Sequence, residues 1–173
     1  IYGSDTPGSY VLQDRDTGEL ILIADERHDI PPDAIGPMVS VTYKARDGLD
    51  IPTILTWPAG ADLQTAGNLP LIVMPHGGPA SYDAVTFDWM AQYFANRGYL
   101  VVQPNFRGST GFGIEHQNLG HGQWGGKMQD DITDGVQTLV DQGLADPDRV
   151  CIVGASYGGY AALAGGAFTP DLY

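Results

Sequence analysis

The chain of 173 residues is poor in cysteine and in basic side chains. Its single cysteine cannot form an internal disulfide, so the fold depends on a hydrophobic core alone. Only 8 Lys and Arg oppose 21 Asp and Glu, which gives a net charge of −13 and argues against binding to nucleic acid or an anionic membrane surface. No apolar run approaches the roughly 20 residues of a membrane-spanning helix.

Hydrophobic residues and glycines are well represented by contrast. The hydrophobic fraction of 43% is too high for a disordered chain, and the 24 glycines follow no three-residue period, which excludes collagen. The sequence starts at Ile1 without a basic-plus-apolar signal segment. We therefore expect a piece of a longer protein, and the compartment, cytoplasmic or periplasmic/secreted, stays open.

The first part of the chain predicts a hairpin and a boundary. Two strand-like runs, 9–14 and 20–24, flank a turn that ends with Gly18. Two prolines within residues 29–33 then interrupt regular structure, because proline removes a donor and restricts the residue before it. We expect residues 1–30 to form one unit, 31–37 a linker and 38–173 a second domain.

The second domain shows the alternation of an α/β protein. A hairpin is predicted over 39–45 and 51–57, followed by short, continuously apolar runs at 70–74, 99–102 and 149–153, typical of buried strands. Helical patterns fall between and after these runs, over 84–97, around 132–140 and over 157–167. This order predicts an open, mostly parallel sheet with helices on both faces.

The motif Gly154-Ala155-Ser156-Tyr157-Gly158-Gly159 joins the last apolar run to the last helix. G-x-S-x-G at a strand-to-helix turn is typical of a nucleophile elbow, in which glycines leave room for the sharp turn and the serine hydroxyl is exposed. The sequence therefore predicts Ser156 as a nucleophile that forms an acyl intermediate.

An oxyanion hole can be placed around this serine. One donor is the backbone N–H of Tyr157, directly after the nucleophile. The second is expected from Pro75-His76-Gly77-Gly78-Pro79, a glycine-rich loop that follows the first buried strand. An ordinary turn is the alternative explanation of this loop.

A general base is missing from the pattern. In α/β hydrolases the acid and the histidine follow the serine, but residues 157–173 contain Asp171 and no histidine. His76 is expected to orient the oxyanion loop rather than act as the base, and His28 is expected to be solvated. His116 and His121 lack the neighbours of a metal site, so no metal and no cofactor are expected.

Several motifs together resemble the prolyl oligopeptidase family of serine peptidases, in its acylaminoacyl-peptidase and dipeptidyl-peptidase-like branch. They are the 75–79 loop, the glycine-rich stretch 105–113, Trp124-Gly125-Gly126 with Asp130-Asp131, the segment 146–150 and Gly154–Gly159. The resemblance implies the N-terminal half of an α/β-hydrolase domain, truncated after the nucleophile helix, with residues 1–30 as the last strands of a β-propeller. It also implies that the triad Asp and His lie beyond Tyr173.

The resemblance assigns roles to residues. Ser156 becomes the nucleophile, Tyr157 and Gly78 supply N–H groups to the oxyanion hole, and His76 is an additional candidate there. Arg107 and Trp124 are interpreted as structural, with Arg107 expected to bind backbone carbonyls, and Cys151 as a small core residue. The expected activity is hydrolysis of short peptides or acyl-peptides, and the chain alone is expected to be inactive or nearly so.

Two alternatives stay open. A lipase or carboxylesterase of the same fold class would share the elbow and differ in its preference for esters. A non-catalytic domain that works by association is the other, because the strand at 149–153 would lack a neighbour on one side. Its partner would be a second copy of the chain or a complementing C-terminal chain.

Overall fold

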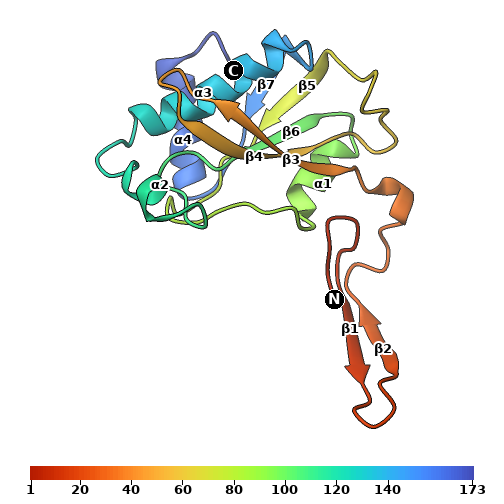
Figure 1. Ribbon diagram of the computed structural model, residues 1–173. Coiled ribbons are helices and arrows are strands. Elements are labelled where there is room, and N and C mark those ends of the chain that lie inside the picture. The colour runs from red at the N-terminus through yellow and green to blue at the C-terminus, as the bar shows by residue number, and fades with distance from the viewer.

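The computed structural model describes all 173 residues and separates them into a hairpin unit and a larger α/β body (Figure 1). Strands β1 (Ser9–Gln13) and β2 (Leu20–Asp25) form an antiparallel two-stranded sheet that projects from the body. The predicted hairpin is thus confirmed. Its assignment to a propeller blade stays a prediction, because two strands can belong to many sheets.

The body is built on a five-stranded mixed sheet in the order β3-β4-β6-β5-β7. The strands are β3 (Met38–Lys44), β4 (Asp50–Thr56), β5 (Leu69–Val73), β6 (Leu100–Pro104) and β7 (Ala145–Ile152). β3, β4 and β6 pair antiparallel, whereas β5 pairs parallel with both β6 and β7. This is the mixed α/β arrangement expected from the order of strand and helix patterns.

Helices cover both faces of the sheet, as predicted. Helix α1 (Trp89–Ala95) packs Ala91 and Ala95 against Ile72 and Val101 on one face. Helices α3 (Lys127–Asp141) and α4 (Tyr157–Phe168) cover the other face, where the main core lies. Successive side chains of the central strands therefore point to different cores, which explains why their sequences are continuously apolar.

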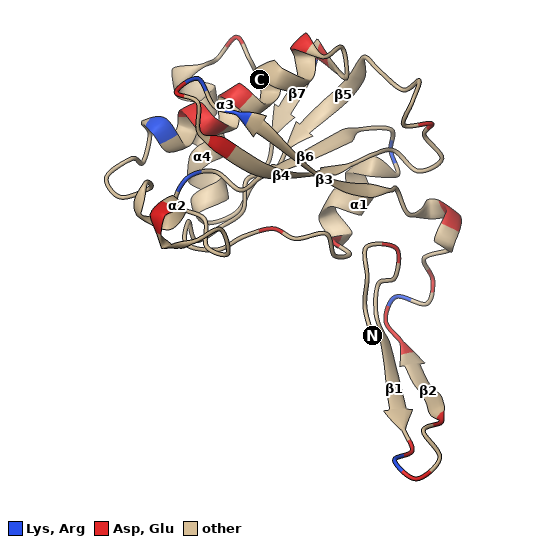
Figure 2. Cartoon of the chain, in the orientation of Figure 1, with Lys and Arg blue, Asp and Glu red and all other residues tan.

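Two shorter helical segments complete the body. The 3-10 turn η1 (Pro32–Ala34) lies in the linker, and the short helix α2 (Ile114–Asn118) lies in the glycine-rich region. None of the helices is both long enough and apolar enough to span a bilayer. Figure 2 shows Asp and Glu distributed over both units, with few basic segments between them.

Some sequence-based boundaries are wrong. The helix expected over 84–97 begins only at Trp89, because the Asp88 carboxylate accepts the N–H groups of Met90 and Ala91 as an N-cap. Residues 146–148 (Asp-Pro-Asp), whose composition is typical of a turn, lie inside β7 as an irregularity of the ladder, since Leu69 pairs with Ala145 and Leu71 with Val150.

The strand expected to be buried at 149–153 is an edge strand. β7 has a neighbour on one side only, so Cys151 is exposed and the expectation of a core cysteine is wrong for this chain. The unpaired side of β7 corresponds to the missing neighbour that motivated the association hypothesis.

Candidate active site

The nucleophile elbow has the geometry that its glycines require. Ser156 lies between β7 and α4 with φ 56° and ψ −122°, a conformation that a non-glycine residue adopts only under strain. A Cβ at Gly154 would overlap the carbonyl of Gly158, and a Cβ at Gly158 would overlap the carbonyl oxygen of Pro75. Ser156 itself is exposed, so its hydroxyl is open to a substrate.

The glycine-rich loop after β5 lies beside this serine. A Cβ at Gly77 would be 3.4 Å from the Ser156 Cβ and 3.9 Å from its Oγ, so the loop backbone borders the hydroxyl directly. Gly78 has a φ of 127°, a conformation that favours glycine. Gly77, which the sequence did not single out, is therefore a candidate donor beside Gly78, because the paired glycines bring both N–H groups to this loop.

The proposed oxyanion donors have no partner within the chain. The N–H groups of Tyr157, Gly77 and Gly78 take part in none of its hydrogen bonds. Tyr157 is the first residue of α4, where the first N–H groups of a helix lack intrahelical acceptors and carry positive dipole character. These groups can therefore donate to an oxyanion that forms beside Ser156.

Both ring nitrogens of His76 have partners, one in its own loop and one in the glycine-rich stretch after β6. Its Nδ1–H donates to the Gly77 carbonyl at 2.8 Å, and its Nε2 lies 2.9 Å from the Ser109 hydroxyl. The ring stacks on Phe106 with 4.6 Å between centroids. Burial lowers the pKa of His76. These contacts suit an orienting role and leave neither nitrogen free to accept a proton from Ser156.

Tyr157 anchors the elbow in an aromatic cluster. Its buried ring lies 5.2 Å from Phe106, 4.9 Å from Trp124 and 5.6 Å from Tyr160, measured between centroids. Burial raises the pKa of the Tyr157 phenol well above its usual range. The packing fixes the start of α4, and with it the direction of the Tyr157 N–H. Trp124 covers this cluster while more than half of its surface stays exposed.

Arg107 has acidic partners rather than the backbone carbonyls expected from the sequence. Its buried guanidinium forms a bidentate pair with Asp131 on α3, with bonds of 2.8 and 2.7 Å, and two further bonds with Asp47 in the β3–β4 turn. Asp131 also accepts the backbone N–H of Arg107 at 2.9 Å. These partners lie 24 and 60 residues away from Arg107, so no local sequence pattern indicates them.

The other histidines take no part in the site. His116 is buried, and its Nε2 lies 3.1 Å from the Asn105 carbonyl oxygen, whereas His121 is exposed. His28 is solvated as predicted and lies 3.0 Å from a carboxylate oxygen of Asp29. No three His, Cys, Asp or Glu side chains are grouped in a way that could hold a metal ion.

A small cavity of about 190 Å³ borders the elbow on the side of α1. Gly77, Ala155 and Trp89 line it together with Asp83 and Asp88. Burial and, to a smaller extent, the nearby Asp88 carboxylate together raise the pKa of Asp83 to about 7. One oxygen of the Asp83 carboxyl is buried without a hydrogen-bond partner.

Comparison with known proteins identifies the class to which this fold and elbow belong. The model of the prolyl oligopeptidase family matches residues 85–173, which include α1, the glycine-rich stretch and the whole elbow. The chain belongs to the prolyl oligopeptidase family of serine peptidases.

Individual relatives place it more finely. The chain is 41% identical to dipeptidyl aminopeptidase BIII of Pseudoxanthomonas mexicana and 35% identical to dipeptidyl peptidase family member 6 of Caenorhabditis elegans. Each alignment covers 98% of this chain and 25% of the relative. The chain therefore spans about a quarter of the length of these relatives.

Solved structures agree with this placement. A puromycin-hydrolysing peptidase of Mycobacterium tuberculosis superposes with a TM-score of 0.82 at 31% identity, over 94% of this chain and 25% of that one. An acylaminoacyl peptidase of Pyrococcus horikoshii gives a TM-score of 0.74 at 25% identity, over 94% of this chain and 26% of that one. The predicted relation to dipeptidyl and acylaminoacyl peptidases is confirmed.

Proposed function

We propose that this chain supplies the nucleophile and the oxyanion hole of a serine peptidase that hydrolyses short peptides or acyl-peptides by acyl transfer. The observation that carries the proposal is the strained conformation of Ser156 between Gly154 and Gly158. Such strain persists only where the surrounding structure enforces it, and it commonly marks a functional site.

In the proposed reaction the Ser156 Oγ attacks the carbonyl carbon of the scissile bond while a base takes its proton. The carbonyl oxygen becomes an oxyanion and accepts hydrogen bonds from the Tyr157 N–H and from the N–H of Gly78, with Gly77 as the adjacent donor. The C–N bond then breaks, the amine leaves with the proton, and water hydrolyses the acyl-serine in a second step.

The base and its orienting acid are proposed to come from outside these 173 residues. The residues after Ser156 include no histidine, and the two nitrogens of His76 are engaged by the Gly77 carbonyl and the Ser109 hydroxyl. In serine proteases that lack triad members, a residual rate of about 10³–10⁴ over water remains from the oxyanion hole and binding. We therefore expect the chain alone to cleave amides at a residual rate.

The first test measures labelling by a fluorophosphonate probe and turnover of an aminoacyl anilide. We expect slow labelling that Ser156→Ala abolishes, with anilide turnover at the residual level. Ser81→Ala is the matched control, because Ser81 is an exposed serine of the same loop region. Labelling that survives Ser156→Ala would refute the nucleophile, whereas anilide turnover at ordinary peptidase rates would show that the base is within the chain.

An esterase of the same fold is the alternative within enzymes. The elbow serves both reactions, so the distinction rests on the ratio of ester to amide hydrolysis in the presence of a complementing C-terminal polypeptide. A peptidase is expected to cleave the anilide efficiently once complemented. Turnover confined to acyl esters would favour the esterase.

Association is a second candidate function, favoured by the open edge of β7. The strand presents unpaired backbone groups on one side and an exposed Cys151. A partner strand from a second copy or from a complementing chain would extend the sheet.

A further inference from the structure

Helix α1 carries an aromatic stripe that the core does not use. The sequence pattern places Trp89 and Tyr93 on a buried face, but 55% of Trp89 and 48% of Tyr93 are exposed. The buried positions of α1 are Ala91, Gln92 and Ala95 instead. Trp89 and Tyr93 are four residues apart and therefore lie on one side of the helix, with Arg97 following at the same spacing.

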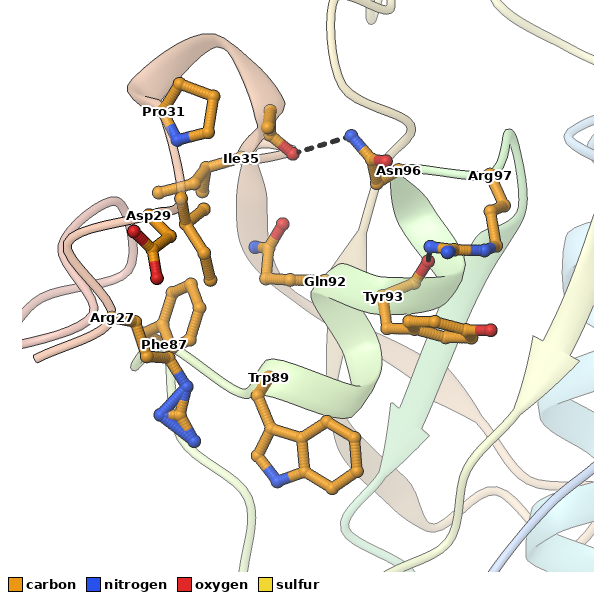
Figure 3. A pocket seen from close by; sticks show the side chains of 12 residues that line it. Arg27, Asp29, Pro31, Ile35, Phe87, Trp89, Gln92, Tyr93, Asn96 and Arg97 are labelled. Atoms are coloured by element: carbon orange, nitrogen blue, oxygen red, sulfur yellow. Dashed lines mark hydrogen bonds between the residues drawn. The ribbon is translucent and has the colours of Figure 1, made fainter.

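This stripe forms one side of a cleft of about 360 Å³ between α1 and the linker (Figure 3). Its volume lies within the range usual for small-ligand sites. The opposite side comes from the linker residues Ile30, Pro31 and Ile35. Trp89 also lines the smaller cavity beside the elbow, so the two cavities share this side chain as a wall.

The walls of the cleft are held together by polar contacts. The buried Gln92 side chain accepts the Gly36 N–H at 2.7 Å and donates to the Gly36 carbonyl at 3.0 Å. The Asn96 amide donates to the Ala34 carbonyl at 3.1 Å (Figure 3). The linker is thus fixed on α1, and the cleft is preformed rather than assembled by a ligand.

The cleft also holds two cations without acidic partners. Five of the eight Lys and Arg side chains form ion pairs with aspartates: Lys44, Arg46, Arg107, Lys127 and Arg149. Of the three that form none, Arg27 and Arg97 line this one cleft, and the third, Arg15, lies in the hairpin turn. In a chain of net charge −13, two unpaired guanidiniums in one cleft leave a place for an anion.

Aromatic rings hold these two guanidiniums in place. The Arg97 guanidinium lies 3.6 Å from the centroid of Tyr93 and donates to the Tyr93 carbonyl at 3.0 Å. Arg27 lies 5.8 Å from the centroid of Phe87. Asp29, the acid of the cleft, is paired with His28 instead. Figure 3 shows Arg27 and Arg97 at opposite ends, with Trp89 and Tyr93 between them.

We propose that this cleft binds a peptide carboxylate together with a neighbouring aromatic or apolar side chain. A guanidinium over a ring, as Arg97 is over Tyr93, keeps donors free, and its planar fork matches the bidentate geometry of a carboxylate. Trp89 and Tyr93 provide the surface for the apolar side chain. That the carboxylate belongs to a peptide rests on the proposed function. That the cleft binds a carboxylate rests on the two arginines alone.

Calorimetric titration of the chain with three short peptides tests the proposal. The probes are N-acetyl-Gly-Phe with a free carboxylate, its C-terminal amide, and N-acetyl-Asp-Phe-amide, which carries the carboxylate on a side chain. We expect the free acid to bind about tenfold more tightly than the neutral amide, because charge-assisted hydrogen bonds are the stronger ones. The third probe shows whether a terminal or a side-chain carboxylate is preferred.

Charge-removing variants locate the site. Since the two guanidiniums lie at opposite ends of the cleft, one carboxylate pairs with only one of them. Either Arg27→Gln or Arg97→Gln is therefore expected to weaken binding of the preferred acid about five- to tenfold, whereas Arg15→Gln, the unpaired arginine outside the cleft, leaves it within about twofold. Equal binding of acid and amide, no binding of any probe, or an equal loss in Arg15→Gln would overturn the proposal. Displacement of the peptide by an equal concentration of inorganic phosphate would also overturn it, in favour of a general anion site.

The Ser156→Ala chain separates this inference from the proposed function. It is expected to bind the preferred peptide with unchanged affinity, because Ser156 does not line the cleft. Intact peptide binding by the native chain, without peptidase activity when that chain is complemented by a C-terminal polypeptide, would contradict the proposed function alone.

Discussion

A few single residues fix the geometry of the nucleophile elbow and of the elements around it. Gly158 is one of them, since its Cα approaches the Pro75 carbonyl so closely that no side chain fits. This contact joins the start of α4 to the loop that carries the proposed oxyanion donors. The stability of the fold and the geometry of the site therefore depend on the same position.

Gly158→Ala is expected to lower the free energy of unfolding by about 3 kcal/mol, because the added methyl group must displace the Pro75 backbone. Gly166→Ala is the matched control in the same helix, where a Cβ meets no atom within 4 Å. That change is expected to raise stability by about 0.5–1 kcal/mol, since alanine favours a helix over glycine. Urea denaturation followed by circular dichroism measures both, and equal effects would contradict the packing argument.

Asp83 gives a second prediction at this scale. Its pKa is raised to about 7, so the folded chain holds this proton more tightly than the unfolded chain, where the carboxyl titrates near 4. Its contribution to stability is therefore present at low pH and is lost as the pH rises from about 4 to about 7.

Asp83→Asn keeps the group neutral and is expected to remove this loss. The difference in the free energy of unfolding between the variant and the native chain is expected to grow by about 1 kcal/mol or more from pH 5 to pH 8. Thermal unfolding at both pH values measures it. The backbone bonds between Asp83 and Asn105 do not depend on the changed side chain. Asp33→Asn, at an exposed acid without hydrogen bonds, serves as the control, and an Asp83→Asn gain that is the same at both pH values would count against the assignment.

At the scale of elements, Arg107 joins three parts of the body. It follows β6, pairs with Asp131 on α3 and reaches Asp47 between β3 and β4. Phe106, directly before it, stacks on His76 of the oxyanion loop. The ion pair thus connects the helix layer with the loop that borders Ser156.

Arg107→Gln is expected to destabilise the fold by about 3–5 kcal/mol, because it leaves the fully buried Asp131 without its counter-charge. Arg46→Gln is the comparison, since Arg46 also pairs with two α3 acids but is more than half exposed. Its loss is expected to stay within about 1 kcal/mol. If chemical denaturation shows similar losses of stability for both variants, burial does not determine how much these ion pairs stabilise the fold.

These elements also show what the sequence can predict. Strands and the elbow were predicted because apolar runs, turn residues and paired glycines are local signals. The buried face of α1 was not, because Gln92 is buried by its bonds to Gly36, 56 residues away. The partners of Arg107 likewise depend on tertiary pairing, which leaves no trace in a short window of sequence. The open side of β7, by contrast, was expected, because no further apolar run follows the elbow to pair with it.

On the scale of the whole molecule, two apolar surfaces are left open. Every residue of β2 is exposed, and the hairpin exposes large side chains that include Leu12 and Ile23. β7 exposes an edge of the five-stranded sheet. An isolated two-stranded hairpin is marginally stable, whereas β7 is held rigid by β5, so β7 is the better template for a partner strand.

The chain is therefore expected to associate as its concentration rises, through β7. Cys151→Lys places a charge on this edge and is expected to shift the chain toward monomer, because charged side chains oppose edge-to-edge pairing. Leu12→Lys, a matched change on the hairpin, is expected to leave association unchanged.

Size-exclusion chromatography with light scattering under reducing conditions measures the mass, and the reducing agent excludes disulfide-linked dimers. A monomer at every concentration would remove the basis for association, and a monomer produced by Leu12→Lys alone would move the interface to the hairpin.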